Sequence, residues 1–190
     1  LEWFTATLLP EMPEEERFAY CNQAVADTPE TQVTFFPYLF GSDLGAEASG
    51  TFIGLRAGTS REEILRAVYE GIVFQHVRHM KRLLAVTDPP EVIRFAGGAT
   101  RSAVWMQMFS DALGIPVTVA QAQELGALGA AICAAVGVGV YDSYHEAIVA
   151  MTGVRETYRP DPTSGVALQR KQLRFEELVS AMEPVWTHHG

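Results

Sequence analysis

The sequence predicts an α/β domain, and three observations lead to that class. A long amphipathic helix pattern runs from Thr59 to about Ala85. Two short runs of apolar and β-branched residues, 92–96 and 117–120, each precede a helix pattern. Those helices are expected over about 102–113 and 125–136. Short strands that alternate with helices are typical of a parallel sheet covered by helices.

The first part of the chain predicts less regular structure. Residues 1–9 form a helix pattern that a proline ends, and residues 10–31 are polar and acidic, as expected of a surface helix followed by a loop. The aromatic run 33–40 predicts a strand, but Pro37 lacks a backbone donor and pushes it toward a sheet edge or an irregular path. Residues 50–55 form a short extended segment.

The helix from Thr59 carries the strongest start signal of the chain. Glu62 lies three residues after Thr59, and Glu63 lies three residues after Ser60, so either pair can form a capping box. The Asp-Pro-Pro sequence at 88–90 ends the pattern.

The last third of the chain predicts two more helices, near 142–151 and 168–182, with a loop at 158–162 between them. Because two strands alone make a poor sheet, we expect further strands from the 30–55 region or from residues outside this sequence. The chain lacks an initiator Met and begins inside a helix pattern, which predicts a fragment of a longer protein.

Composition narrows the class of protein. The 190 residues are 48% hydrophobic and 19% charged, as in folded soluble domains. The net charge of −9 argues against a nucleic-acid partner, because phosphate backbones are held mainly by Lys and Arg. The apolar run 125–140 is short and interrupted by glycines, so we expect no membrane span. Cys21 and Cys133 are expected to be reduced packing residues of a cytoplasmic protein.

The most informative segment is Gly97-Gly98, which follows a strand pattern and precedes a helix pattern. Glycines let a ligand approach the backbone closely, and the first N–H groups of a helix attract anions. A nucleotide phosphate or ribose suits such a place, although many α/β proteins use glycine there only for packing. The glycine-rich stretch 121–131 leaves the same two interpretations open, a helix beside a nucleotide with Glu124 at its mouth or tight packing on a sheet.

Other candidates have structural interpretations. Glu63 is expected as a helix cap and Glu70 as a solvated side chain. His76 and His79 lie on the long helix without a third ligand nearby, which favours surface or packing roles over metal binding.

Three segments in this order resemble the C-terminal domain of the FGGY family of carbohydrate kinases, which includes xylulose and L-xylulose kinases. The stretch 50–70 resembles the family's second signature, 97–114 its adenosine-binding segment, and 124–131 its Glu-x-x-Ala-Leu-Gly-Ala-Ala helix. The residues that carry the resemblance are Gly50, Phe52, Gly54, Leu55, Glu63, Ile64, Ala67, Val68, Tyr69, Glu70, Gly97, Gly98, Ser102, Trp105, Gln107, Asp111 and Gly114.

The resemblance implies a ribonuclease-H-like domain of the actin-like ATPase fold, here incomplete. Residues 1–190 would form the C-terminal, ATP-side domain of a two-domain sugar kinase, without the N-terminal sugar-binding domain and its catalytic Asp. It implies ATP with Mg²⁺, a small sugar as partner, and, as in many relatives, a homodimer. The residues that it places against ATP are Gly97, Gly98, Ala99, Ser102 and Glu124, with no catalytic residue and no metal ligand in this chain.

The expected function is therefore ATP-dependent phosphorylation of a sugar hydroxyl, on a pentulose or a related ketose or polyol, by the full-length protein. The fragment alone is expected to be inactive. The chain has Gly41-Ser42-Asp43 where xylulose kinases have Gly-Glu-Arg, which argues against D-xylulose and toward L-xylulose kinases or other subgroups. The alternatives are a non-catalytic actin-like module that binds a nucleotide or a partner, or the same fold with glycines used only for packing.

Overall fold

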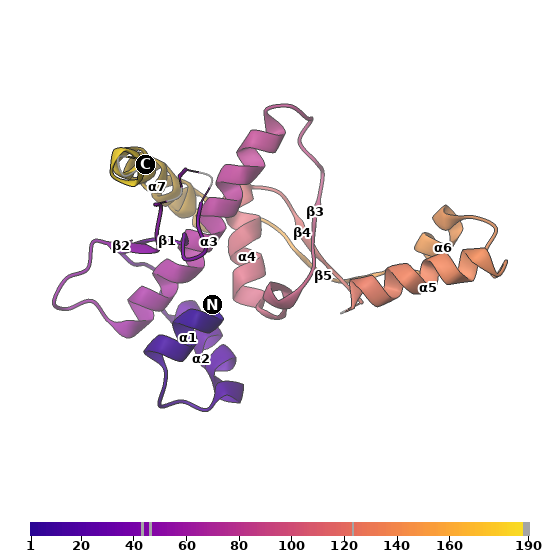
Figure 1. Ribbon diagram of the computed structural model, residues 1–190, viewed down its shortest axis with the longest axis horizontal. Coiled ribbons are helices and arrows are strands. Elements are labelled where there is room, and N and C mark those ends of the chain that lie inside the picture. Colours follow the sequence, from indigo (N-terminus) through magenta and orange to yellow (C-terminus); the bar gives the residue numbers. More distant parts are fainter. Residues whose placement is uncertain (43, 46, 123, 188–190) are drawn as a thin grey trace. The chain divides into compact units, whose positions relative to one another are not determined.

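A computed structural model describes residues 1–42, 44–45, 47–122 and 124–187. Asp43, in the segment that differs from the Gly-Glu-Arg of xylulose kinases, therefore lies outside the described residues. The chain divides into two compact units, Leu1–Pro89 with Pro162–Gly190, and Pro90–Asp161. Figure 1 shows the helices and strands, coloured by their position in the sequence. They are α1 (Glu2–Leu8), α2 (Glu14–Asp27), β1 (Thr34–Phe36), β2 (Thr51–Ile53), α3 (Arg61–Leu84), β3 (Ile93–Phe95), the 3₁₀ turn η1 (Gly98–Arg101), α4 (Ala103–Leu113), β4 (Val117–Ala120), α5 (Leu125–Gly137), α6 (Tyr144–Met151), β5 (Val154–Tyr158) and α7 (Pro162–Thr187).

The first unit is built around α3, and its start confirms the capping prediction. Of the two candidate pairs, Ser60 and Glu63 form the box: each side chain accepts a hydrogen bond from the other residue's backbone N–H, at 3.2 and 2.8 Å. Glu62 instead accepts a hydrogen bond from the Tyr20 hydroxyl of α2, at 2.8 Å. The start of the helix is therefore also its link to α2.

One side of α3 packs against the hairpin β1–β2, in which Thr34 pairs with Ile53 and Phe36 with Thr51. β1 ends at Phe36, directly before Pro37, as a proline that cannot donate to the ladder requires. Phe36 also contacts two rings of α7, those of Phe175 and Trp186, with centroids 5.2 and 5.4 Å away. The core of the first unit thus combines β1, α3 and α7, which are far apart in sequence.

The expectation of a solvated Glu70 is wrong. Its residue is 2% exposed, and its carboxylate accepts hydrogen bonds from Arg66 on the same helix and Lys171 on α7, at 2.8 to 3.0 Å. Arg66 also donates to the backbone carbonyls of Val25 and Thr28 at the end of α2. A buried carboxylate needs such partners, and here they tie three helices together.

The second unit contains a three-stranded sheet in the order β3-β4-β5. β3 and β4 are parallel, as predicted, and Phe95 pairs with Val119. The expected source of the third strand is wrong, because that strand is β5, antiparallel to β4, in a segment for which the sequence suggested no strand. The 30–55 region forms its own hairpin in the first unit.

The last helix of the chain, α7, begins earlier than expected. It starts at Pro162 and not near 168, since proline is tolerated at the first helical position.

The two long helices of the second unit differ in burial. α4 buries Trp105, Met106, Met108 and Phe109, as its amphipathic pattern indicates. α5 packs against α6, and Ile132 is its one buried residue. Cys133 on α5 is exposed, so the expectation that both cysteines are packing residues holds for the buried Cys21 alone.

Candidate functional site

The topology brings two of the glycine-containing segments to one edge of the sheet. β3 and β4 are parallel and paired in register, so both end at the same edge. The turn from Gly97 follows β3, and Glu124 with the start of α5 follows β4. Ligands of open α/β sheets bind beyond the carboxyl ends of such strands. The fold therefore places the candidate residues where a ligand is expected.

Gly97 has a backbone conformation that favours glycine, with φ +89°. It is followed by η1, in which Thr100 N–H donates to Gly97 C=O at 3.1 Å. The amides of Gly98 and Ala99 precede this first bond of the turn, which is the position of helix N–H groups that lack an internal acceptor. A β-carbon at Gly97 would meet nothing within 4 Å, and one at Gly98 would meet only the Arg101 side chain, at 3.7 Å. Neither glycine is therefore demanded by close packing of the described residues.

The helix expected over about 102–113 is α4, which begins at Ala103, and the 3₁₀ turn η1 lies between it and Gly97. Ser102 is the N-cap of α4: its hydroxyl oxygen accepts a hydrogen bond from Trp105 N–H at 3.2 Å, and the residue is 1% exposed. The hydroxyl of a residue that the resemblance places against ATP thus caps the start of α4.

Other residues of the expected adenosine segment stabilise the unit. Asp111 is buried, and its Oδ1 accepts hydrogen bonds from Gln107 Nε2 and from Asp161 N–H, at 2.7 and 2.8 Å. Gln107 Nε2 also donates to the carbonyl of Arg159, at 2.7 Å. Gly114 ends α4 with φ +66° in the left-handed conformation. The Gln and Asp of this segment therefore hold the chain that follows β5.

Sequence reasoning missed Arg155, which lies on the unpredicted strand β5. Its Nη2 donates to the carbonyl of Thr100 inside η1, at 2.7 Å, and so holds the glycine turn from the side. Farther along β5, Tyr158 donates to Glu156 at 2.6 Å, and burial, with this bond, raises the pKa of the tyrosine to about 12. The β-branched and aromatic residues of 154–158 were the signal available for this strand.

Glu124 is the N-cap position of α5, exposed, and makes no side-chain capping bond. A β-carbon added at Gly126 or Gly129, in the helix that follows, would meet no atom within 4 Å, so tight packing on the sheet is not their role among the described residues. Of the five residues expected at ATP, the structure thus brings Gly97, Gly98 and Ala99 into one turn and leaves Glu124 open at the same sheet edge.

The residues described in the structure contain no group of three or more His, Cys, Asp or Glu side chains that could hold a metal ion. His79 has Gln75 as a neighbour, at 2.8 Å between the side-chain nitrogens.

Within the same described residues, no helix is long and apolar enough to cross a membrane.

Comparison with known proteins identifies the family. The model of the C-terminal domain of the FGGY family of carbohydrate kinases matches residues 1–138. The chain belongs to this family. Its mixed α/β structure is that of the actin-like ATPase domains in these kinases, and the crystal structure of xylulose kinase from Rhodospirillum rubrum matches it with a TM-score of 0.85 at 29% identity. That match covers 97% of this chain and 38% of the solved one.

Two curated relatives have related names. The L-xylulose/3-keto-L-gulonate kinase of Escherichia coli K12 is 37% identical over 185 residues, which are 96% of this chain and 36% of the relative. A probable L-xylulose kinase of Pasteurella multocida is 32% identical over 168 residues, which are 87% of this chain and 34% of the relative. The chain therefore spans only about a third of the length of these three proteins.

Proposed function

We propose that the protein containing this chain transfers the γ-phosphoryl group of ATP to a hydroxyl of a small sugar, a pentulose or a related ketose or polyol. In this proposal residues 1–190 supply the adenosine side of the cleft, and a preceding domain supplies the sugar site and the catalytic base. The observation that carries it is the open turn Gly97–Ala99 at the carboxyl edge of the parallel pair β3–β4. Family membership supplies the chemistry.

In this proposal the turn at Gly97–Ala99 binds the nucleotide and takes no part in the chemical step. The amides of Gly98 and Ala99 donate to the nucleotide, and the missing β-carbon of Gly97 leaves room for the nucleotide to lie against the backbone. Glu124 and the start of α5 form the neighbouring wall. ATP brings Mg²⁺, which neutralises phosphate charge, and its ligands in this proposal are the phosphates and side chains outside this chain. Arg155 keeps η1 in place through Thr100.

The test is steady-state kinetics of the intact protein with Gly97→Ala. We expect KM for ATP to rise about tenfold or more while KM for the sugar stays within about twofold, because only nucleotide contacts change. Gly114→Ala is the matched control, since Gly114 also has positive φ and no atom within 4 Å of an added β-carbon, but ends α4. Equal effects of the two variants on KM for ATP would contradict the proposal.

A sugar panel tests the substrate class. L-xylulose and 3-keto-L-gulonate come first, since those are the substrates in the name of the Escherichia coli relative, with D-xylulose, gluconate and glycerol as competitors. The 190-residue chain alone should show no sugar-dependent ADP release, and turnover by it would overturn the proposed division of roles. If the intact protein bound an ATP analogue but phosphorylated no sugar of the panel when given ATP, the non-catalytic nucleotide-binding module would be favoured.

A further inference from the structure

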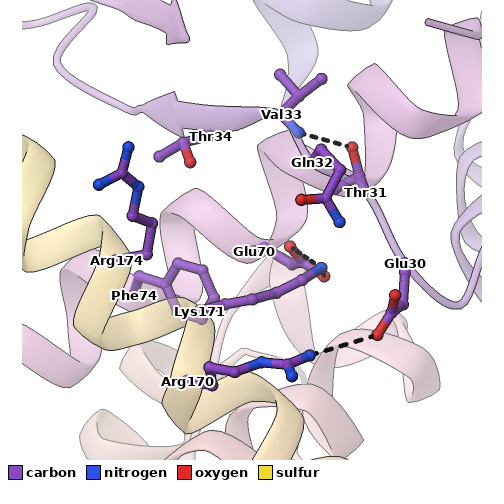
Figure 2. Close-up of a pocket in the computed structure, with 10 residues that line it drawn as sticks. All are labelled: Glu30, Thr31, Gln32, Val33, Thr34, Glu70, Phe74, Arg170, Lys171 and Arg174. Carbon is purple, nitrogen blue, oxygen red and sulfur yellow. Dashed lines mark hydrogen bonds and ion pairs between the residues drawn. The ribbon is translucent and has the colours of Figure 1, made fainter. Parts of the chain in front are cut away.

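The first unit contains a cavity of about 470 Å³ that none of the proposed ATP residues lines. Figure 2 shows it between the segment that leads into β1, one side of α3 and one side of α7. Such a volume is within the range of small-molecule sites. The lining residues are Glu30, Thr31, Gln32, Val33, Thr34, Glu70, Phe74, Arg170, Lys171 and Arg174.

The inner wall of the cavity is an ion-pair cluster whose carboxylate is already satisfied. Both oxygens of Glu70 accept from Lys171, at 2.9 and 3.0 Å, and one also accepts from Arg66, at 2.8 Å. Figure 2 shows Lys171 reaching across the cavity toward Glu70. Two cations on one buried carboxylate leave one positive charge in excess, which water screens poorly there.

The mouth of the cavity carries two arginines one helical turn apart, Arg170 and Arg174. Their current partners are weak ones: Arg170 lies 3.9 Å from Glu30, and Arg174 lies 3.2 Å from Glu177. All four of these side chains are more than half exposed, and exposed pairs of this kind contribute little to stability. Both guanidinium groups can therefore exchange these partners for a better one.

The opposite wall adds neutral polar groups. Figure 2 shows the side chains of Gln32 and Thr34 on the side of the cavity that faces α7. An amide and a hydroxyl can both donate hydrogen bonds to an oxygen-rich ligand. Among the residues that line the cavity, the cations Arg170, Lys171 and Arg174 outnumber the carboxylates Glu30 and Glu70, in a chain whose net charge is −9. The cavity is thus a local reversal of the charge of the protein.

We propose that this cavity binds a small phosphate-bearing anion, a sugar phosphate in size, with Arg170 and Arg174 as its charged partners. The planar guanidinium group matches a phosphate in a two-bond geometry, and the arginines reach a ligand at the mouth by leaving exposed carboxylates. Gln32 and Thr34 bind the opposite side of the ligand, and Phe74 offers an apolar wall to its carbon chain. The inference does not depend on the proposed ATP site.

The test is calorimetric titration of the intact protein with ribose 5-phosphate, with inorganic phosphate and neutral ribose as further probes. We expect ribose 5-phosphate to bind, phosphate to bind more weakly, and ribose to give no heat. Arg174→Ser should lower the affinity about tenfold, the effect of one charge-assisted contact. Arg56→Ser removes the same charge from an exposed site of the same unit and should leave it unchanged.

Two further variants test the binding geometry of Arg174 and the independence of this cavity from the proposed ATP site. Arg174→Lys keeps the charge but not the two-bond geometry, and we expect an affinity between those of the wild type and Arg174→Ser. Gly97→Ala should bind ribose 5-phosphate like the wild type, so a failure of the ATP proposal would not affect this result. Absence of binding, or equal losses in Arg174→Ser and Arg56→Ser, would overturn the inference.

Discussion

Helices α3 and α5 both carry family motifs, yet their surroundings are opposite. α3 begins with a complete capping box, buries residues along its length and holds the ion-paired Glu70. α5 contains no charged residue, has no side-chain cap and buries only Ile132. The glycines differ in the same way: an added β-carbon at Gly71 of α3 would overlap the Phe35 carbonyl, whereas Gly129 of α5 has open space.

This difference shows that the packing contacts of α3 are formed within the chain, whereas most of α5 has no such contacts among the described residues. A helix without charges gains its stability in a protein from burial, so an exposed apolar helix is a surface that lacks its partner. α3 has that partner in β1, α2 and α7. If the proposed kinase function is correct, we expect the apolar side of α5 to be covered in the intact protein. Three substitutions and one labelling experiment can break or sharpen this contrast.

The largest effect is expected from Gly71→Ala. The new methyl group would meet the backbone oxygen of Phe35, which cannot move without shifting β1, so we expect a loss of about 3 kcal/mol in unfolding free energy. Urea denaturation followed by tryptophan fluorescence measures it. A variant as stable as the wild type would show that α3 and β1 are not in close contact.

Glu70→Gln is expected to be nearly as damaging. It leaves Arg66 and Lys171 without their shared carboxylate in a buried place, which costs about 3 kcal/mol. Glu11→Gln is the control, because the Arg61–Glu11 pair has the same 2.8 Å separation but is exposed. We expect no measurable change in the urea midpoint for the control, and similar changes in both variants would contradict the role of burial.

Gly129→Ala should have a smaller effect whose sign depends on what covers α5. In the 190-residue chain the methyl group enters open space, and the helix gains about 1 kcal/mol from the better helix former. In the intact protein we expect a loss instead, because a covered glycine marks a close approach. Thermal melting of the two variants measures both signs, and a gain in both proteins would show that α5 stays uncovered.

Cysteine alkylation probes the contrast without a mutation and with the least disturbance. In the folded chain at pH 8, iodoacetamide should modify the exposed Cys133 and spare Cys21. Cys21 is buried, and burial raises its pKa to about 11, so only about one molecule in a thousand carries the reactive thiolate. In the intact protein we expect Cys133 to be protected as well. Mass spectrometry of the labelled peptides measures both sites.

The sequence predicted the local parts of the fold well. The helix at 61–84, its capping box and the parallel strands β3 and β4 follow from periodicity and cap residues, which are local signals. The strand β5 was missed because four exposed residues followed by one buried tyrosine carry little pattern of their own. Pairing with β4 makes this segment a strand, and pairing is a property of the sheet.

The candidate site shows the same division. Gly97-Gly98 after a strand was visible in the sequence, and so was the motif that led to the family. The role of Ser102 as a helix cap and the support that Arg155 gives to η1 were not, since each depends on where another element places its atoms.

By itself, the amino-acid sequence determined the capped start of the long helix, the strands at 92–96 and 117–120 and which family the chain resembles, because caps, periodicity and motifs act over a few residues. Only the tertiary structure decided that Glu70 is a buried junction, that β5 completes the second sheet and that cationic side chains of α7 meet the segment before β1 in one cavity. Those outcomes depend on contacts between segments far apart in the chain, a hundred residues or more for Lys171 with Glu70 and for Arg170 with Glu30, and no local pattern contains the energies of such contacts.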